Sequence, residues 1–203
     1  MRAHHLQQVR QHQTPNALER ATPFQLVGRQ SFGVDTELGM TLTGLKTNYE
    51  MPLHTLALAE ELAGGDLAGR TIAVCGVSYL AEVADTRNTP TETLLDALLE
   101  RGARVKVHDP HVVTWVERPD TEVLQSLTHA LKKADGVVFA VPHRAYTELS
   151  AEELLAQLDR SAFVVDAQDV LTDEKAQLLH EAGRRVVGVG KGHWRTRGYH
   201  LTE

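Results

Sequence analysis

From Gly69 to the end of the sequence, short continuous apolar runs alternate with segments that repeat apolar residues at helical spacing. A strand that is apolar along its whole length has to be covered on both faces, and strands separated by helices pair in parallel. The pattern therefore predicts a three-layer α/β sandwich with a Rossmann-like parallel sheet. The predicted strands are 72–75, 105–108, 136–141, 163–166 and 185–189.

Cap and turn residues predict where the intervening helices begin and end. The sequence TPTE at 89–92 has the order of a capping box, with a threonine cap, a proline at the first helical position and a glutamate after it. The helix that follows is predicted to end at Gly102. Ser150 is the predicted cap of the helix AEELLAQL, and two other helices are predicted to end at Ala134 and to cover 173–182.

The sequence before residue 69 contains no predicted strand. Residues 1–31 are rich in Gln, His and Arg, and we expect them to be poorly ordered apart from a short helix at 16–20. Residues 32–68 are predicted to form a helical arm of two helices. Pro52 suits the first turn of the second helix, and the glycines at 64–65 end it. We therefore divide the chain into a tail, an arm and an α/β domain over 69–203.

A stripe of leucines runs along the predicted arm. An apolar stripe of this size should not remain in water, and we therefore expect a homodimer through residues 32–64. The alternative is that the stripe folds back onto the sheet of its own chain. The stripe consists of Leu38, Leu42, Leu45, Leu53, Leu56 and Leu62.

Composition excludes several classes of function. The formal net charge of −6 gives no support to a nucleic-acid partner. No apolar run approaches the roughly 18 residues that span a bilayer, so we expect no membrane segment. The single cysteine excludes an internal disulfide and favours the cytoplasm. Eleven histidines are present, but none has the close helical spacing of a metal site, so we expect solvated histidines and no metal.

An unusually long polar loop, 76–88, separates the first predicted strand from its helix. Such loops usually have about two to six residues, so a longer one is functional or disordered. It leaves the carboxyl end of a parallel strand and leads into a helix N-terminus, a place that favours a phosphate. No phosphate loop of the GKS type is present. The glycines at 188–192 are predicted to form a flexible turn, because no helix is predicted after them.

The same region carries a family resemblance. Residues 69–112, GRTIAVCGVSYLAEVADTRNTPTETLLDALLERGARVKVHDPHV, resemble the C-terminal UDP-binding domain of the UDP-glucose/GDP-mannose dehydrogenase family. VVFAVPHRAY and FVVDAQDVL are similar to later parts of that domain, and residues 32–62 are similar to the end of the family's central helical domain. The resemblance covers about 31–192. The residues that fall on the family pattern are Gly76, Tyr79, Asp85, Arg87, Pro90, Asp109 and Pro110.

The resemblance implies a nucleotide-sugar ligand, a place in polysaccharide biosynthesis and a dimer interface in the central helices. The sequence also differs from the family pattern in several places. The family's NAD-binding domain and catalytic cysteine motif have no counterpart before Phe32, and Cys75 is expected to be a buried core residue. We therefore expect no catalytic residue in this chain, and NAD only where a partner chain supplies the missing domain. Leu80 and Gln168 stand where the family has cations, so UDP binding should be weak.

The resemblance nominates eight residues as the nucleotide site, and several have a structural alternative. Arg87 either binds phosphate or pairs with Asp85. Tyr79 either stacks on a base or sugar or plugs the rim of the core. Asp109 either contacts a ribose or forms a turn before Pro110. The nominated residues are Gly76, Tyr79, Leu80, Asp85, Thr86, Arg87, Asp109 and Gln168.

Two functional hypotheses remain, from different classes. The first is a domain that binds UDP or a UDP-sugar and that is inactive as a dehydrogenase by itself. The second is a structural or dimerisation module that has lost its ligand. A third possibility is the C-terminal part of a split dehydrogenase, with a separate NAD-binding chain as partner. Calorimetry with UDP separates the first two hypotheses.

Overall fold

The computed structural model describes residues 39–201. The chain divides into two compact units at Met51 and Pro52. The predicted tail 1–31, its short helix at 16–20 and the beginning of the predicted arm lie outside the described residues. The larger unit, which begins at Pro52, contains the sheet.

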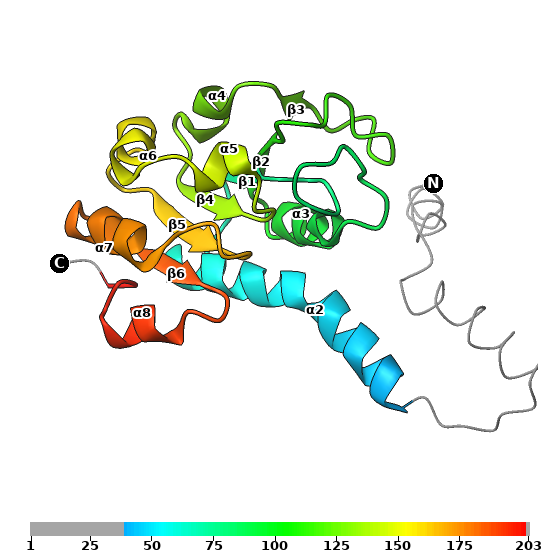
Figure 1. The fold of residues 1–203 in the computed structure, drawn as a ribbon, viewed down its shortest axis with the longest axis horizontal. Coiled ribbons are helices and arrows are strands. Elements are labelled where there is room, and N and C mark those ends of the chain that lie inside the picture. The colour runs from blue at the N-terminus through cyan, green and yellow to red at the C-terminus, as the bar shows by residue number, and fades with distance from the viewer. Residues whose placement is uncertain (1–38, 202–203) are drawn as a thin grey trace, which may run out of the picture. The chain divides into compact units, whose positions relative to one another are not determined.

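Six parallel strands form one sheet in the order β3-β2-β1-β4-β5-β6 (Figure 1). The parallel α/β fold predicted from the apolar runs is confirmed, and each of the predicted strands is present. One strand, β3, was not predicted, because two residues are too short to show a period. The strands are β1 (Thr71–Cys75), β2 (Arg104–His108), β3 (Val123–Leu124), β4 (Gly136–Phe139), β5 (Phe163–Asp166) and β6 (Val186–Gly188).

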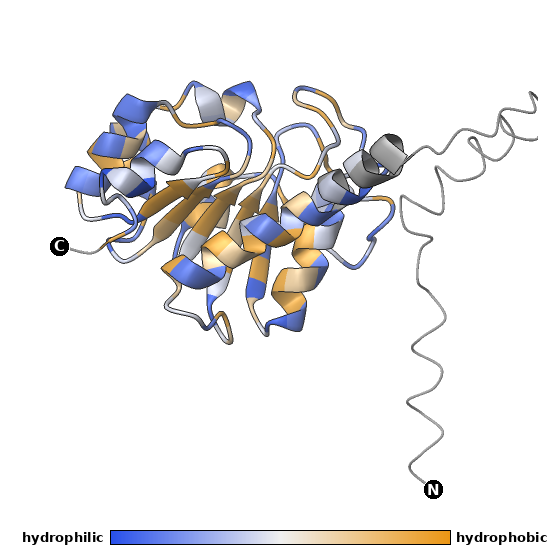
Figure 2. Cartoon of the chain, turned by 90° about the horizontal axis from the view of Figure 1, so that it is seen from below, coloured by the Kyte–Doolittle hydropathy of each residue, from blue (hydrophilic) through white to orange (hydrophobic). Residues whose placement is uncertain are grey.

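Helices cover both faces of this sheet. One face packs against the end of α2 and against α3, and the other against α4, α6, α7 and the C-terminal segment. Figure 2 shows most of the strand residues coloured as hydrophobic, whereas the helices are coloured as hydrophobic on some residues and hydrophilic on others. The helices are α2 (Gly39–Leu62), α3 (Pro90–Glu100), α4 (Leu127–Leu131), α5 (Arg144–Thr147), α6 (Ala151–Gln157), α7 (Asp173–Glu181) and α8 (Gly192–Thr196).

The predicted caps lie at the observed helix starts. The Thr89 hydroxyl accepts a hydrogen bond from the backbone N–H of Thr91, and Pro90 is the first residue of α3. Ser150 and Glu153 form a reciprocal capping box at α6. Each cap satisfies N–H groups that have no partner within the helix, which fixes the point at which the chain leaves the loop.

The prediction of two helices in the arm is wrong for the described residues. One helix, α2, continues through Pro52. A proline inside a helix removes one backbone hydrogen bond. The following turns are nevertheless buried against the sheet, where Leu56 is 3% and Leu62 is 1% exposed, and this burial keeps the chain helical. None of the described helices is both long and apolar enough to cross a membrane.

Among the side chains that the structure describes, some leucines of the stripe are buried and one is exposed. Leu56 and Leu62 pack on the sheet of their own chain, which was the alternative to a dimer. Leu53 is 45% exposed and remains available to a partner.

The C-terminal turn also differs from the prediction. After the glycines a short helix, α8, begins at Gly192. Trp194 explains it: the indole is fully buried in the core, and its Nε1 donates to Asp173 Oδ1 at 2.8 Å. A single anchored side chain gives no periodic signal in the sequence, which is why no helix was predicted here.

Candidate functional site

The 76–88 loop leaves the sheet at its topological switch point. β1 lies between β2 and β4, so the chain moves to one side of β1 first and to the other side later. In open parallel sheets ligands bind beyond the carboxyl ends of the strands at this point. The carboxyl end of β1, with the loops after β2 and β4, is thus the candidate site.

Gly76 allows the loop to turn sharply at the end of β1. Its φ is +100°, and a Cβ at this position would lie 2.5 Å from Val141 Cβ. No side chain fits in that space without movement of its neighbours. Gly76 therefore acts through close packing between the loops after β1 and β4.

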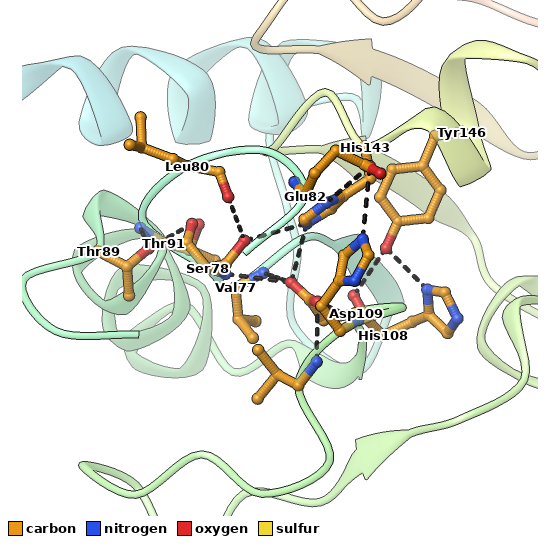
Figure 3. A network of polar contacts seen from close by, with 12 residues as sticks. Val77, Ser78, Leu80, Glu82, Thr89, Thr91, His108, Asp109, His143 and Tyr146 are labelled. Atoms are coloured by element: carbon orange, nitrogen blue, oxygen red, sulfur yellow. Dashed lines mark hydrogen bonds and ion pairs between the residues drawn. The ribbon is translucent and has the colours of Figure 1, made fainter. Parts of the chain in front are cut away.

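Asp109 is the centre of the polar network below the loop (Figure 3). Its side chain is completely buried, and Oδ2 accepts from the backbone N–H groups of Val77 and Ser78 at 2.8 and 3.1 Å. Oδ1 accepts from His111 N and Val112 N at 2.8 and 3.1 Å. The structure thus has the turn-forming arrangement that was the alternative to a ribose contact.

These hydrogen bonds also set the charge of Asp109. Burial by itself would raise the pKa of this carboxyl group. The hydrogen bonds from the His143 side chain and from the backbone of Val77 and His111 outweigh that effect and hold the pKa at about 2. Asp109 is therefore an anion at neutral pH and holds the loops after β1 and β2 together.

His143 joins the loop after β4 to this network. Its ring is fully buried, Nε2 lies 3.1 Å from Asp109 Oδ2 and 3.0 Å from Ser78 Oγ, and Nδ1 accepts the backbone N–H of Glu82 at 3.0 Å. An Nδ1 that accepts is unprotonated, so we assign the ring proton to Nε2, which then donates to Asp109. Figure 3 shows the imidazole between the loop and the carboxylate.

Ser78, His143 and Asp109 do not form a nucleophilic triad. In such a triad the serine and the carboxylate contact different ring nitrogens. Here both contact Nε2. The Ser78 hydroxyl donates to the Leu80 carbonyl at 2.8 Å and is buried. The cluster is a structural clamp for the loop.

The expectation that the histidines are solvated is wrong for two of them. His143 is buried in the clamp, and His108 is 4% exposed with its Nδ1 2.8 Å from the Tyr146 hydroxyl. Burial lowers the pKa of His108. Burial also raises the pKa of Tyr146 far above its usual range, so the phenol stays protonated. A neutral pair thus fills the space behind the clamp.

The outer edge of the loop carries the exposed candidates. Tyr79 is 54% and Leu80 59% exposed, so Tyr79 does not plug the core. Arg87 is exposed and forms a two-nitrogen ion pair with Asp85, with Nε–Oδ1 at 2.9 Å and Nη2–Oδ2 at 2.6 Å. The Arg87 side chain and backbone hydrogen bonds lower the pKa of Asp85 to about 2. The ion-pair alternative for Arg87 is the one present in the structure.

The remaining candidates are placed differently. Thr86 is buried, and its hydroxyl donates to Glu117 Oε2 at 2.5 Å. Gln168 is exposed after β5, two strands away from β1 in the sheet. Its backbone N–H donates to Asp166, a buried carboxylate whose pKa is raised by burial. The structure therefore brings most of the candidates into one loop, with only some of their side chains facing outward.

Comparison with known proteins identifies the domain. Residues 73–173 match the model of the UDP-glucose/GDP-mannose dehydrogenase family, UDP binding domain. This α/β domain belongs to the UDP-glucose/GDP-mannose dehydrogenase family. The match begins within β1 and ends at the start of α7, so it contains the whole 76–88 loop and the clamp.

Relatives of the UDP-binding domain are nucleotide-sugar dehydrogenases. UDP-glucose 6-dehydrogenase of Rickettsia prowazekii is 29% identical over 150 residues, 72% of this chain and 34% of the relative. UDP-N-acetyl-D-mannosamine dehydrogenase of Methanocaldococcus jannaschii is 26% identical over 152 residues, 74% of this chain and 33% of the relative. The chain thus spans about a third of the length of the curated relatives it matches.

A solved structure agrees with the assignment. NDP-N-acetyl-D-galactosaminuronic acid dehydrogenase from Methanosarcina mazei superposes with a TM-score of 0.71 at 26% identity. The match covers 83% of this chain and 36% of that chain.

Sequence reasoning missed the clamp of the UDP-binding domain. His143 contacts residues that are far from it in the chain, and no local spacing shows such contacts. One signal was present: His143 directly follows an apolar strand and a proline, at the carboxyl edge of the sheet where polar side chains converge. Ser78 and Glu82, the residues that it contacts in the loop, were not among the candidates.

Proposed function

We propose that the domain binds the nucleotide part of a UDP-sugar at the exposed edge of the 76–88 loop. One observation carries the proposal: at the switch point of the sheet, the clamped loop turns Tyr79 and Arg87 toward solvent. An aromatic ring suits the face of a base or sugar, and a guanidinium suits a phosphate. The names of the relatives, which are dehydrogenases of UDP-sugars, support the choice of ligand.

The loop offers further donors to a diphosphate. Within the part of the chain that the structure describes, the backbone N–H groups of Leu80 and Ala81 have no hydrogen-bond partner. The N-terminus of α3 offers less than expected, because Pro90 has no N–H and the Thr89 hydroxyl already accepts from Thr91. We therefore place the diphosphate against the outer loop, next to Arg87.

Three features make this binding weak. Asp85 already engages Arg87 and would repel a phosphate, and neither Leu80 nor Gln168 carries a charge. A hydrogen bond to a charged group is worth about 1.5–3 kcal/mol. The loss of two such contacts therefore weakens binding by roughly 10²- to 10⁴-fold relative to a site that has both.

We propose that the domain does not catalyse hydride transfer by itself. That reaction needs a nicotinamide and a positioned nucleophile. The single thiol, Cys75, is completely buried in β1, and burial raises its pKa well above the usual range. NAD chemistry would then require a partner chain that supplies the nicotinamide site, and a cytoplasmic location would fit the single reduced cysteine.

A calorimetric titration with UDP tests the proposal on the parent chain and two variants. We expect weak binding by the parent, and a gain of roughly tenfold in Leu80→Lys if one contact of about 1.4 kcal/mol is formed. Arg87→Ala should abolish the remaining binding. Arg160→Ala is the matched control, because Arg160 is an exposed arginine that precedes β5 at the opposite edge of the sheet.

Thermal melts separate folding from binding in each variant. If Leu80→Lys melts like the parent and no chain binds UDP at millimolar nucleotide, the loop is structural. The domain then belongs to the second class, a structural or dimerisation module.

A further inference from the structure

Three potential metal ligands lie close together at the 76–88 loop: Glu82 of the loop itself, His111 and His143. They come from the loops after β1, β2 and β4, and one ligand atom of each lies within 4.8 Å of the other two. Neither the nucleotide proposal nor the clamp around Asp109 uses the side chain of His111.

The distances suit a small divalent ion. Glu82 Oε1 lies 3.4 Å from His111 Nε2 and 3.6 Å from His143 Nδ1. Tetrahedral zinc with bonds of about 2.0–2.1 Å places neighbouring ligand atoms about 3.3–3.4 Å apart. The two distances from Glu82 Oε1 to the histidine nitrogens therefore require little movement. For an ion to bind, His111 Nε2 and His143 Nδ1 would also have to move to about the same distance from each other.

The second ring nitrogen of His143 is held as in known metal sites. A histidine that ligates a metal commonly donates its other N–H to a carboxylate, which fixes the tautomer and orients the ring. His143 Nε2 donates to Asp109 Oδ2 at 3.1 Å, and both side chains are fully buried. Nδ1, with its lone pair toward Glu82, is therefore in the form that binds metal.

Two existing hydrogen bonds involve atoms of this site: Glu82 Oε1 accepts from the backbone N–H of Arg144 at 2.8 Å, which leaves a second lone pair for an ion, and the other occupies His143 Nδ1. The backbone N–H of Glu82 now donates to His143 Nδ1 at 3.0 Å, and the ion needs the same lone pair. Glu82 has a φ of +62°, a backbone conformation that is unfavourable for a residue other than glycine. A rotation of the Glu82 backbone would release this N–H and relieve the strain.

We propose that Glu82, His111 and His143 form a zinc site that joins the three loops at the carboxyl edge of the sheet. Two imidazoles and one carboxylate favour zinc and similar transition metals over calcium or magnesium. Glu82 and His111 are partly accessible to solvent, which gives the ion a path of entry. The fourth position is left to water or to an oxygen of a ligand.

Zinc titration of the metal-stripped full chain against a chromogenic chelator tests this site, and cobalt spectra report a tetrahedral environment. His4, His5 and His12 are replaced by alanine in every protein, so that tail histidines do not contribute. We expect one equivalent of zinc in this background. Glu82→Gln and His111→Ala should each weaken the affinity for zinc at least tenfold. His129→Ala, which removes an exposed histidine on α4, should leave the affinity unchanged.

Melting temperatures with and without zinc complete the test. Zinc should raise the melting temperature of the background protein and not that of His111→Ala, because only the bound ion stabilises the folded state. In the presence of a chelator the variants should melt together, which shows that they fold. Absence of zinc binding in the background protein, or unchanged affinity in both Glu82→Gln and His111→Ala, would overturn the proposal and leave the three side chains as a hydrogen-bonded cluster.

Discussion

His143 Nε2 lies 3.1 Å from Asp109 Oδ2, and both side chains are completely excluded from solvent. The contact joins the loops that follow β4 and β2, across the strand between them. The same Oδ2 accepts two backbone N–H groups of the loop after β1. One carboxylate thus fixes the relative positions of three loops at the carboxyl edge of the sheet.

We predict that Asp109→Asn destabilises the domain by about 3–5 kcal/mol. The substitution removes the charge that the buried His143 and four backbone N–H groups contact, and the new amide NH₂ meets donors rather than acceptors. Urea unfolding at neutral pH measures the loss. A change below about 1 kcal/mol would contradict the central role of Asp109.

Asp109 also predicts how stability depends on acid. Its folded pKa of about 2 is below the ordinary value of 3.8, so the stabilisation is fully present above about pH 4 and is lost as the pH falls through about 2. The shift corresponds to roughly 2 kcal/mol. The difference in unfolding free energy between the parent and Asp109→Asn should therefore shrink over this range. A difference that does not vary with pH would show that the carboxyl group titrates normally.

Gly76→Ala should lower the free energy of unfolding by roughly 2–5 kcal/mol. Alanine is strained at a positive φ, and its methyl group would overlap Val141. Gly190→Ala is the matched control. Gly190 also has a positive φ, of +74°, but nothing lies within 4 Å of an added Cβ, so the expected cost is about 1 kcal/mol. Chemical unfolding of both variants separates the effect of packing from that of the backbone, and equal costs would show that the contact with Val141 is not limiting.

Arg195 and Glu61 form a two-nitrogen ion pair between α8 and α2, with Nη1–Oε1 at 2.6 Å and Nη2–Oε2 at 2.5 Å. Both side chains are more than a third exposed, so solvent screens the pair. A double-mutant cycle with alanine should give a coupling below about 1 kcal/mol that falls further at about 1 M salt. A larger coupling that is insensitive to salt would mean that this contact is better shielded than its exposure indicates.

The homodimer through residues 32–64 stays a prediction. Leu56 and Leu62 are buried within their own domain, whereas Leu53 is 45% exposed, so Leu53 is the leucine with a described side chain that can test this interface. Light scattering at tens of micromolar (order of magnitude) should give a dimer for the parent and a monomer for Leu53→Glu. Val113→Glu, at a valine that is 72% exposed in a loop, controls for added charge and should remain a dimer. A monomeric parent rules the interface out.

The parts of the fold that could be predicted are those with a local signal. Most of the predicted strands were recognised because they are continuous apolar runs, although β2, RVKVH, alternates polar and apolar residues. The caps at Thr89 and Ser150 were recognised because side chain and N–H lie close together in sequence. The prediction failed at Pro52, since burial of the turns after it outweighs its local preference. That burial depends on packing, which the sequence does not display.

The sequence predicted where the site lies, but only some of the residues that form it. The end of β1 follows from the alternation of strands and helices, and this places the loop. The role of His143 depends instead on the order of β2, β1 and β4, which brings three separated segments together. Ion pairing of Arg87 with Asp85 was one of two alternatives, and the sequence alone had no means to choose between them.

Burial of Cys75 has a practical consequence for experiments on this protein. A thiol reagent meets no accessible sulfur in the folded domain, so it reacts only when β1 separates from its neighbours. The rate of labelling under native conditions therefore measures the free energy of that opening. Cys75 thus reports on unfolding without any added label. A cysteine introduced at the surface would react with a spectroscopic probe while the domain is folded, and Cys75 would not.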